Sequence, residues 1–235
     1  MDSIYMNKAM EAYKKNLANV REIMATDPNY METLEKMVSI SEGNTKTGKF
    51  PSVSLLPRLS CPWSRCKGTC GEKCYAIKLA KLRPVVMEAY ARNTAVLKLC
   101  PVAYFRAVGN AIRRASFFRF HIAGDIPNKD YLYMMHYLAE NNPSCTILCF
   151  TKQYEIVNDY LAHNVKPSNL QILFSGWTNL DPVNPYNLPE TTVYKTEADK
   201  KPEWIACGGN CLDCAIHDGG CWKAQKGDIV AFKIH

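Results

Sequence analysis

The chain has 235 residues, of which 47% are hydrophobic and 22% are charged, as in a globular protein that buries one sizeable core. No apolar stretch approaches the roughly 20 residues of a membrane-spanning helix, so we expect no membrane segment. The first residues lack the order of a secretory signal peptide, which indicates a cytoplasmic protein whose cysteines are reduced or metal-bound. The formal net charge of +7 suits a polyanionic partner, but it suits a basic enzyme equally well.

Two helices are predicted at the amino terminus. Residues 2–25 carry apolar side chains at spacings of three and four, and Asp27-Pro28 is typical of the start of a second helix that runs to about Ile40. A polar loop follows, and residues 52–60 then predict a short strand that leads into the first cysteines.

Helices and strands alternate in the middle of the chain. Pro84 should split a helical pattern over residues 72–99, and a further helix is expected over residues 104–115. Strands are then predicted at 117–127, 145–152 and 169–177, separated by helices at 128–141 and 153–163, the first of them capped by Asn128. This order implies a parallel sheet with right-handed crossovers. Residues 178–204 are rich in Pro and Asn and predict irregular structure.

These elements predict an α/β protein with one compact domain. It would consist of a helical extension over residues 1–43, a partial barrel of parallel strands with crossover helices over residues 44–180, and an irregular cysteine-rich segment over residues 181–235. Because the sequence predicts too few strands for a full eight-stranded barrel, we expect a half barrel similar to part of a TIM barrel.

Eight of the eleven cysteines fall into two groups. The first cysteine group is Cys61, Cys66, Cys70 and Cys74, and the second cysteine group is Cys207, Cys211, Cys214 and Cys221. Because short loops bring thiolates to one centre, two metal sites are expected. The spacing of the first group, with glycines nearby, favours an iron–sulfur cluster. In the second group Cys211 and Cys214 have zinc spacing, so zinc and iron–sulfur both stay open there, with His217 as an alternative ligand.

Candidate polar residues follow the predicted strands. Ligands of parallel α/β sheets bind at the carboxyl ends of strands, where HIAGDIP, FTK and FSGW occur. His121 is a candidate acid–base group, although a lone histidine in an apolar strand is more often a hydrogen-bonded core residue. Cys100, Cys145 and Cys149 are interpreted as structural.

The cysteine loop and the AGDIP segment resemble the radical S-adenosylmethionine superfamily. Its members carry C-x3-C-x2-C after the first barrel strand and a GGEP-like motif after the second. Here CKGTC supplies C-x3-C, the next cysteine comes one residue late, and Asp125 stands in place of the glutamate. The resemblance implies a 4Fe–4S cluster with one open iron and S-adenosylmethionine as cofactor. It implies that Gly124 and Asp125 bind the amine of the cofactor and that Thr151, Lys152 and Ser175 line the site at the strand ends, so the cofactor-binding candidates are Gly124, Asp125, Thr151 and Ser175. With His121 added from its place in the strand, the catalytic candidates are Asp125, Lys152 and His121.

From Asn44 onward the chain more closely resembles the phage gene product eighty-eight family. The motifs are NTKTGK, CGEKCYA, FRFHIAGDI, CFTKQY, LQILFSGW and the final IVAFKIH. This family pattern contains Cys61, Cys70 and Cys74 and leaves Cys66 as an addition. It implies a phage origin, a location in the host cell cytoplasm and a metal-bearing fold, but no particular activity.

Three functions are compatible with the sequence. The first is an iron–sulfur enzyme that uses S-adenosylmethionine and needs an electron donor, with the second cysteine group as an auxiliary metal site. The second is an iron–sulfur enzyme whose open iron binds the substrate directly. The third is a zinc-stabilised protein that binds nucleic acid, although we interpret Arg113, Arg114 and Arg119 as exposed residues of a helix and a strand. Whether the substrate is a small molecule or a nucleic acid stays open.

Overall fold

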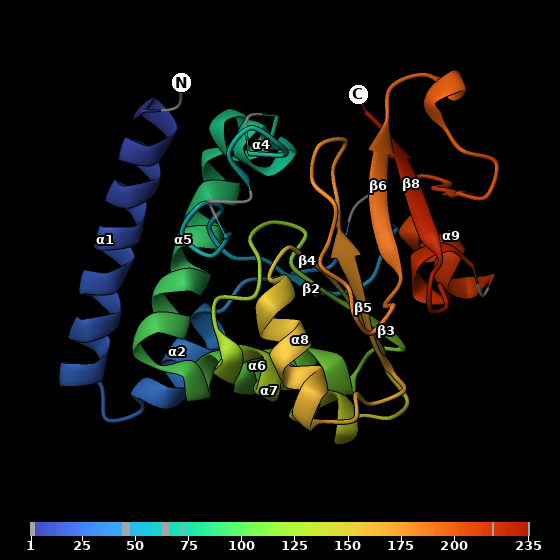
Figure 1. The fold of residues 1–235 in the computed structure, drawn as a ribbon. Helices are drawn as coiled ribbons and strands as arrows, with labels where there is room; N and C mark the ends of the chain where they lie inside the picture. The colour runs from blue at the N-terminus through green and yellow to red at the C-terminus, as the bar shows by residue number, and fades with distance from the viewer. Residues whose placement is uncertain (1–2, 44–47, 63–65, 72, 218, 235) are drawn as a thin grey trace.

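A computed structural model describes residues 3–43, 48–62, 66–71, 73–217 and 219–234, and its strands form one sheet (Figure 1). In spatial order the strands are β1 (Ile40–Ser41), β2 (Ser52–Val53), β3 (Phe117–Phe120), β4 (Thr146–Thr151), β5 (Leu170–Ser175), β6 (Glu190–Tyr194), β8 (Ile229–Lys233) and β7 (Ile205–Ala206). The first pair, β1 and β2, is antiparallel, and the other pairs are parallel. The expected α/β fold with a mostly parallel sheet is therefore confirmed.

The helices of the amino-terminal half follow the sequence prediction closely. They are α1 (Ser3–Thr26), α2 (Tyr30–Met37), α4 (Tyr75–Leu82), α5 (Pro84–Leu99) and α6 (Pro101–Arg113). Pro84 and Pro101 occupy first turns, where a missing backbone N–H removes no helical hydrogen bond. Pro84 therefore separates two helices, and Pro101 starts α6 three residues before the predicted position.

The crossover helices lie where periodicity and capping predict them. They are α7 (Lys129–Glu140) and α8 (Tyr154–His163). The side chain of Asn128 accepts a hydrogen bond of 2.9 Å from the backbone N–H of Tyr131, so the predicted cap is confirmed.

The carboxyl-terminal segment is more regular than the sequence predicts. It contains β6, β7 and β8, the helix α9 (Cys211–Ile216) and the 3-10 turns η1 (Glu197–Asp199) and η2 (Gly220–Trp222). The expectation of irregular structure is wrong because β6 and β8 are short and gain their hydrogen bonds from each other across about 40 residues of chain. The local sequence of each strand contains no pattern that predicts this pairing.

The two faces of the sheet are covered by different parts of the chain. Phe118, Phe120 and Ile147 point to the face that packs against α5, α6, α7 and α8. The alternate residues Leu148 and Leu173 point to the opposite face, which we call the inner face, and α9 and η2 cover it with Trp222 and Phe50 among others. In Figure 1, α9 and α5 accordingly lie on opposite sides of the strands.

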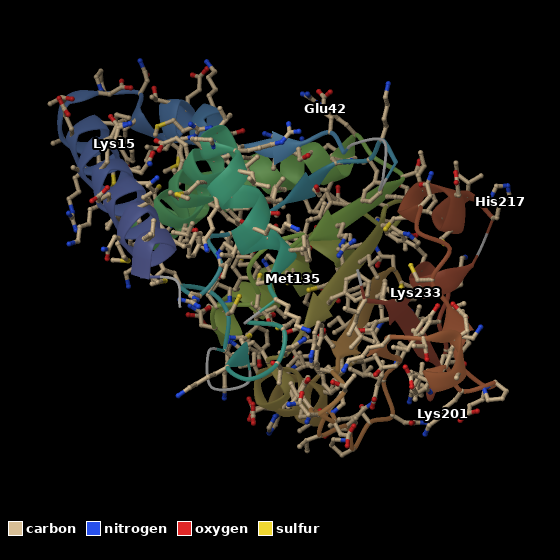
Figure 2. The ribbon with its side chains drawn as sticks, turned by 90° about the horizontal axis from the view of Figure 1, so that it is seen from above. Lys15, Glu42, Met135, Lys201, His217 and Lys233 are labelled. Carbon is tan, nitrogen blue, oxygen red and sulfur yellow. The ribbon has the colours of Figure 1, made fainter. Side chains whose placement is uncertain are left out.

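The helix α1 packs along α5 and holds the start of the cysteine loop. Tyr5 and Ala9 are buried against Leu56 and Ile77. Seen from above in Figure 2, Met135 lies in the interior, whereas Lys15 and Lys201 lie at the periphery. Among the described helices, none is long and apolar enough to cross a membrane.

Candidate metal centre

A cavity of about 330 Å³ lies at the carboxyl ends of the parallel strands. Figure 1 shows α4 at the end of the molecule toward which the arrowheads of β6 and β8 point. The cavity lining includes the whole first cysteine group and the predicted strand-end residues, namely Cys61, Cys66, Cys70, Cys74, His121, Gly124, Asp125, Thr151, Lys152 and Ser175. The fold thus brings together residues that span more than 100 positions of the chain.

Within the first cysteine group, the thiol of Cys66 contacts those of Cys61 and Cys70. Cys66 is buried, and hydrogen bonds to Cys61 and Cys70, together with burial, raise the pKa of its thiol. The same contact with Cys66 and the positive charge of Lys152 lower the pKa of Cys70 to about 6, against the opposing effect of burial. Cys70 therefore ionises more readily than Cys66 or Cys74, whose pKa values are raised.

Cys74 lies at the start of α4, beside the other thiols. Burial raises the pKa of its thiol, while the N–H groups of Ile77 and Ala76 act in the opposite direction. The hydroxyl of Tyr75 donates to the backbone oxygen of Ile122 and so ties α4 over the end of β3.

Within the described part of the chain, no three His, Cys, Asp or Glu side chains stand at the spacing of a preformed metal site. The thiols are thus close together without forming a complete coordination shell.

The AGDIP segment runs directly beside the chain that leads into Cys61. The backbone of Ala123 bonds to Leu55 and Ser54, and the N–H of Asp125 donates to Ser60 Oγ at 3.2 Å. Gly124 has a φ of +86°, and a Cβ at this position would lie 2.9 Å from the oxygen of Leu55. The glycine is therefore required by close backbone packing as well as by its left-handed conformation.

The carboxylate of Asp125 joins the ends of β3 and β4. It accepts hydrogen bonds from Thr151 Oγ1 at 2.6 Å and from the backbone N–H groups of Ile126 and Lys152 at 2.7 and 2.9 Å. Burial raises its pKa to about 6, and these hydrogen bonds limit the rise. Because a carboxylate has about four acceptor positions, three of which are used here, the group mainly serves to fix these two strand ends.

Lys152 supplies positive charge at the cavity wall. It is only 6% exposed, and its Nζ donates to Ser175 Oγ at 2.5 Å. Ser175 is itself held because its backbone oxygen accepts a hydrogen bond of 2.6 Å from the Tyr154 hydroxyl. The ammonium group is thus positioned beside Cys70, where it favours the thiolate.

The structure favours the core interpretation of His121. Its Nε2 lies 3.0 Å from the hydroxyl of Tyr131, which in turn lies 2.8 Å from the hydroxyl of Tyr104. Burial, assisted by the charge of Arg119, lowers the pKa of His121 to about 3. The imidazole is therefore neutral near pH 7 and unsuited to act as a general acid there.

The second cysteine group lies on the inner face of the sheet. Cys207 follows β7, Cys211 and Cys214 lie on α9, and Cys221 lies in η2. Burial raises the pKa of Cys221, and the charges of the other three cysteines add to this rise. All four cysteines pack against the same apolar cluster on the inner face, and within the described residues no three of them stand at the spacing of a preformed metal site. The N–H of Gly209 donates to Cys207 Sγ at 3.4 Å.

Arg119 is the residue of this region that the sequence prediction placed wrongly. It lines the cavity from the inner face of β3, and its Nη1 lies 3.6 Å from Cys211 Sγ. An arginine between aromatic residues in a short strand fits either face, and only the register of β3 decides the matter.

His217, the alternative ligand, is exposed at the end of α9 and points away from the body in Figure 2. His235 and residues 44–47 of the NTKTGK motif lie outside the described residues.

One protein family matches nearly the whole chain. The family described as Gene product 88 matches residues 8–227, a range that includes both cysteine groups and every strand-end residue of the cavity. The chain belongs to the Gene product 88 family. The resemblance to this phage family is therefore confirmed, whereas the match gives no support to the radical S-adenosylmethionine superfamily. No curated protein and no solved structure matches the chain.

Proposed function

We propose that the protein is an iron–sulfur enzyme whose 4Fe–4S cluster is held by the first cysteine group where this group lines the cavity. The observation that supports this proposal is the convergence of four thiols from one loop on a cavity at the carboxyl ends of parallel strands. A cavity of about 330 Å³ favours a small-molecule substrate over a nucleic acid.

The donor set fits such a cluster in its chemistry. Three thiolates suffice when one iron stays open, and four thiols are present. The family pattern favours Cys61, Cys70 and Cys74, but the contacts of Cys66 with two of these thiols make it an equally good ligand. The charge of Lys152 stabilises thiolate character at Cys70. When bound, the cluster would supply either a single electron or a Lewis-acidic iron.

We extend the proposal to S-adenosylmethionine as the cofactor. From β2 to β6 and on to β8 the spatial order of the strands follows the chain, as it does in a partial barrel. The AGDIP segment lies beside the cysteine loop, where Gly124, Thr151 and Ser175 would contact the cofactor. An electron donor of the infected cell would have to reduce the centre.

The state of Asp125 favours a second candidate function. Because its carboxylate already accepts three hydrogen bonds from the chain, little of it is available for the amine of a cofactor. In that case the substrate itself would bind the open iron, and Lys152 would orient an anionic group of that substrate.

Iron content after anaerobic purification tests the centre. We expect a brown protein with about four irons and four sulfides at the first group. Cys70→Ser and Cys74→Ser should lose this iron because each removes a thiolate ligand. Cys100→Ala changes a cysteine outside both groups and should keep the iron. A colourless protein that binds no iron on reconstitution would contradict the proposal.

Two further measurements separate the alternatives. If Cys66→Ser keeps the cluster and Cys61→Ser loses it, the ligands are those of the family pattern. Release of 5′-deoxyadenosine from S-adenosylmethionine by the reduced protein would support the first candidate. Iron without such cleavage would support direct binding of the substrate.

A further inference from the structure

Arg119 stands in the wall between the cavity and the second cysteine group. Its guanidinium carbon lies over the ring of Phe150, 4.6 Å from the ring centroid, on the inner face of the sheet. Its Nη1 reaches to 3.6 Å from Cys211 Sγ.

This cation has no carboxylate partner among the described residues. None of the ion pairs that those residues form includes Arg119, and its Nε is buried without a hydrogen-bond acceptor. A guanidinium stays charged at every physiological pH, and a poorly hydrated charge is costly unless an anion lies nearby. The ionisable group that the guanidinium contacts is the sulfur of Cys211 in the second cysteine group.

We propose that the second cysteine group binds one Zn²⁺ through four thiolates and that Arg119 is the counter-ion of this site. Four thiolates around a divalent ion carry a net charge of two minus, half of which a neighbouring guanidinium offsets. Cys211 and Cys214 lie three residues apart on α9 and so share one helical face, and a C-x2-C pair is the spacing that zinc sites use. The backbone N–H of Gly209 donates a hydrogen bond to Cys207 Sγ, and this bond favours the thiolate form of Cys207.

The inference adds a role for Arg119 that the proposed iron–sulfur centre does not require. Arg119 is a positioning residue, since it orients Cys211 and does not itself bind the metal. Because the same side chain lines the cavity, zinc binding would also fix one wall of the candidate active site.

Zinc affinity of the full chain tests the proposal. In a Cys70→Ser/Cys74→Ser background, which disables the first group, we expect one tightly bound Zn²⁺ per chain. Arg119→Met should weaken zinc binding by roughly 10- to 100-fold in competition with a chelator, as loss of a residue that contacts a metal ligand typically does. Arg119→Lys keeps the charge and should weaken zinc binding less than Arg119→Met. Arg113→Met, at the exposed end of α6, should bind zinc with the affinity of the parent.

Co²⁺ in place of Zn²⁺ supplies a spectroscopic readout. Four thiolates should give the intense sulfur-to-cobalt absorption of a tetrahedral site, and Cys211→Ser should weaken it. The proposal is overturned if Arg119→Met and Arg119→Lys both bind zinc as tightly as the parent, if Arg113→Met weakens zinc equally, or if the background protein assembles a brown cluster. Iron at the first group is measured separately in the unmodified chain, so failure of either proposal is recognised independently.

Discussion

His121 and Asp125 lie four residues apart at the end of β3, and burial shifts their pKa values in opposite directions. The pKa of His121 falls to about 3, and that of Asp125 rises to about 6. Each shift favours the neutral form of the side chain. As the pH falls toward 6, the end of β3 therefore loses negative charge, and Lys152 and Arg119 dominate the electrostatics of the cavity.

From these two pKa shifts we predict opposing effects of pH on the free energy of unfolding of the metal-free protein. The free energy of unfolding contributed by Asp125 falls as the pH rises from about 4 to about 6, because only the folded state still holds its proton there. The contribution of His121 falls as the pH drops from about 6.5 toward 3, because only the unfolded state gains a proton. Between pH 4 and 6 each slope is about 1.4 kcal/mol per pH unit, and the two cancel.

Single variants should expose each slope. Relative to the wild type, Asp125→Asn should gain stability as the pH rises from about 4 to 6, and His121→Asn should lose it, by about 1.4 kcal/mol per pH unit in each case. Asparagine suits position 121 because it tolerates the positive φ of 58° found there. Urea unfolding at several pH values measures both effects. Curves that run parallel to the wild type would show that neither group titrates in this range.

Two glycines with similar backbone angles predict different costs of substitution. Gly124 has a φ of +86° and no room for a Cβ, whereas Gly68 has a φ of +75° and no described residue with an atom within 4 Å of a Cβ. Gly68→Ala should therefore cost about 1 kcal/mol of unfolding free energy, for the left-handed conformation alone. Gly124→Ala should cost about 3 kcal/mol, because overpacking is added. Equal losses on thermal unfolding would argue against the close approach of Leu55.

At the scale of elements, β3 shows what a strand pattern leaves open. FFRF predicts a strand correctly, but its alternation places Phe118 and Phe120 under the helices and turns Arg119 to the inner face. Since aromatic residues flank Arg119 on both sides, hydropathy alone does not assign its face. The pairing of β3 with β4 settles the assignment and with it the counter-ion role that we propose.

The helix α1 acts as a brace for the cysteine loop. Tyr5 is fully buried against Leu56 and Ile77, and its hydroxyl donates to the oxygen of Pro57, four residues before Cys61. Its neighbour Ile4 is 70% exposed. The first turn of α1 therefore supports the segment that carries the proposed cluster.

Matched substitutions in this turn test the brace. Tyr5→Ala should lower the free energy of unfolding by about 3 kcal/mol, because a large buried side chain is removed. Ile4→Ala should change it by no more than about 0.5 kcal/mol. Denaturant titration of both variants measures the difference. A loss for Ile4→Ala as large as that for Tyr5→Ala would contradict the brace at Tyr5, because alanine is the better helix former at both positions and an exposed side chain has little packing to lose.

At the scale of the whole molecule, the sheet is covered unequally. Long helices pack on one face, and the inner face is covered largely by the short elements α9 and η2. Trp222 anchors this cover, since it packs edge-on against Phe50 and Phe117 and its Nε1 donates to the oxygen of Cys211. The Zn²⁺ that we propose at the second cysteine group would stabilise this small cover, because its four ligands would tie β7, α9 and η2 together.

The sequence by itself determined the elements from α4 to β5, the two cysteine groups and the strand-end residues of the cavity. These depend on local periodicity, on capping, on short loop spacing and on the rule that parallel strands end at one edge. Only the tertiary structure decided the pairing of β6, β7 and β8, the inner-face position of Arg119, the contacts of Cys66 and the hydrogen bonds that occupy Asp125. Each of these depends on strand register or side-chain packing, and several join residues far apart in the chain.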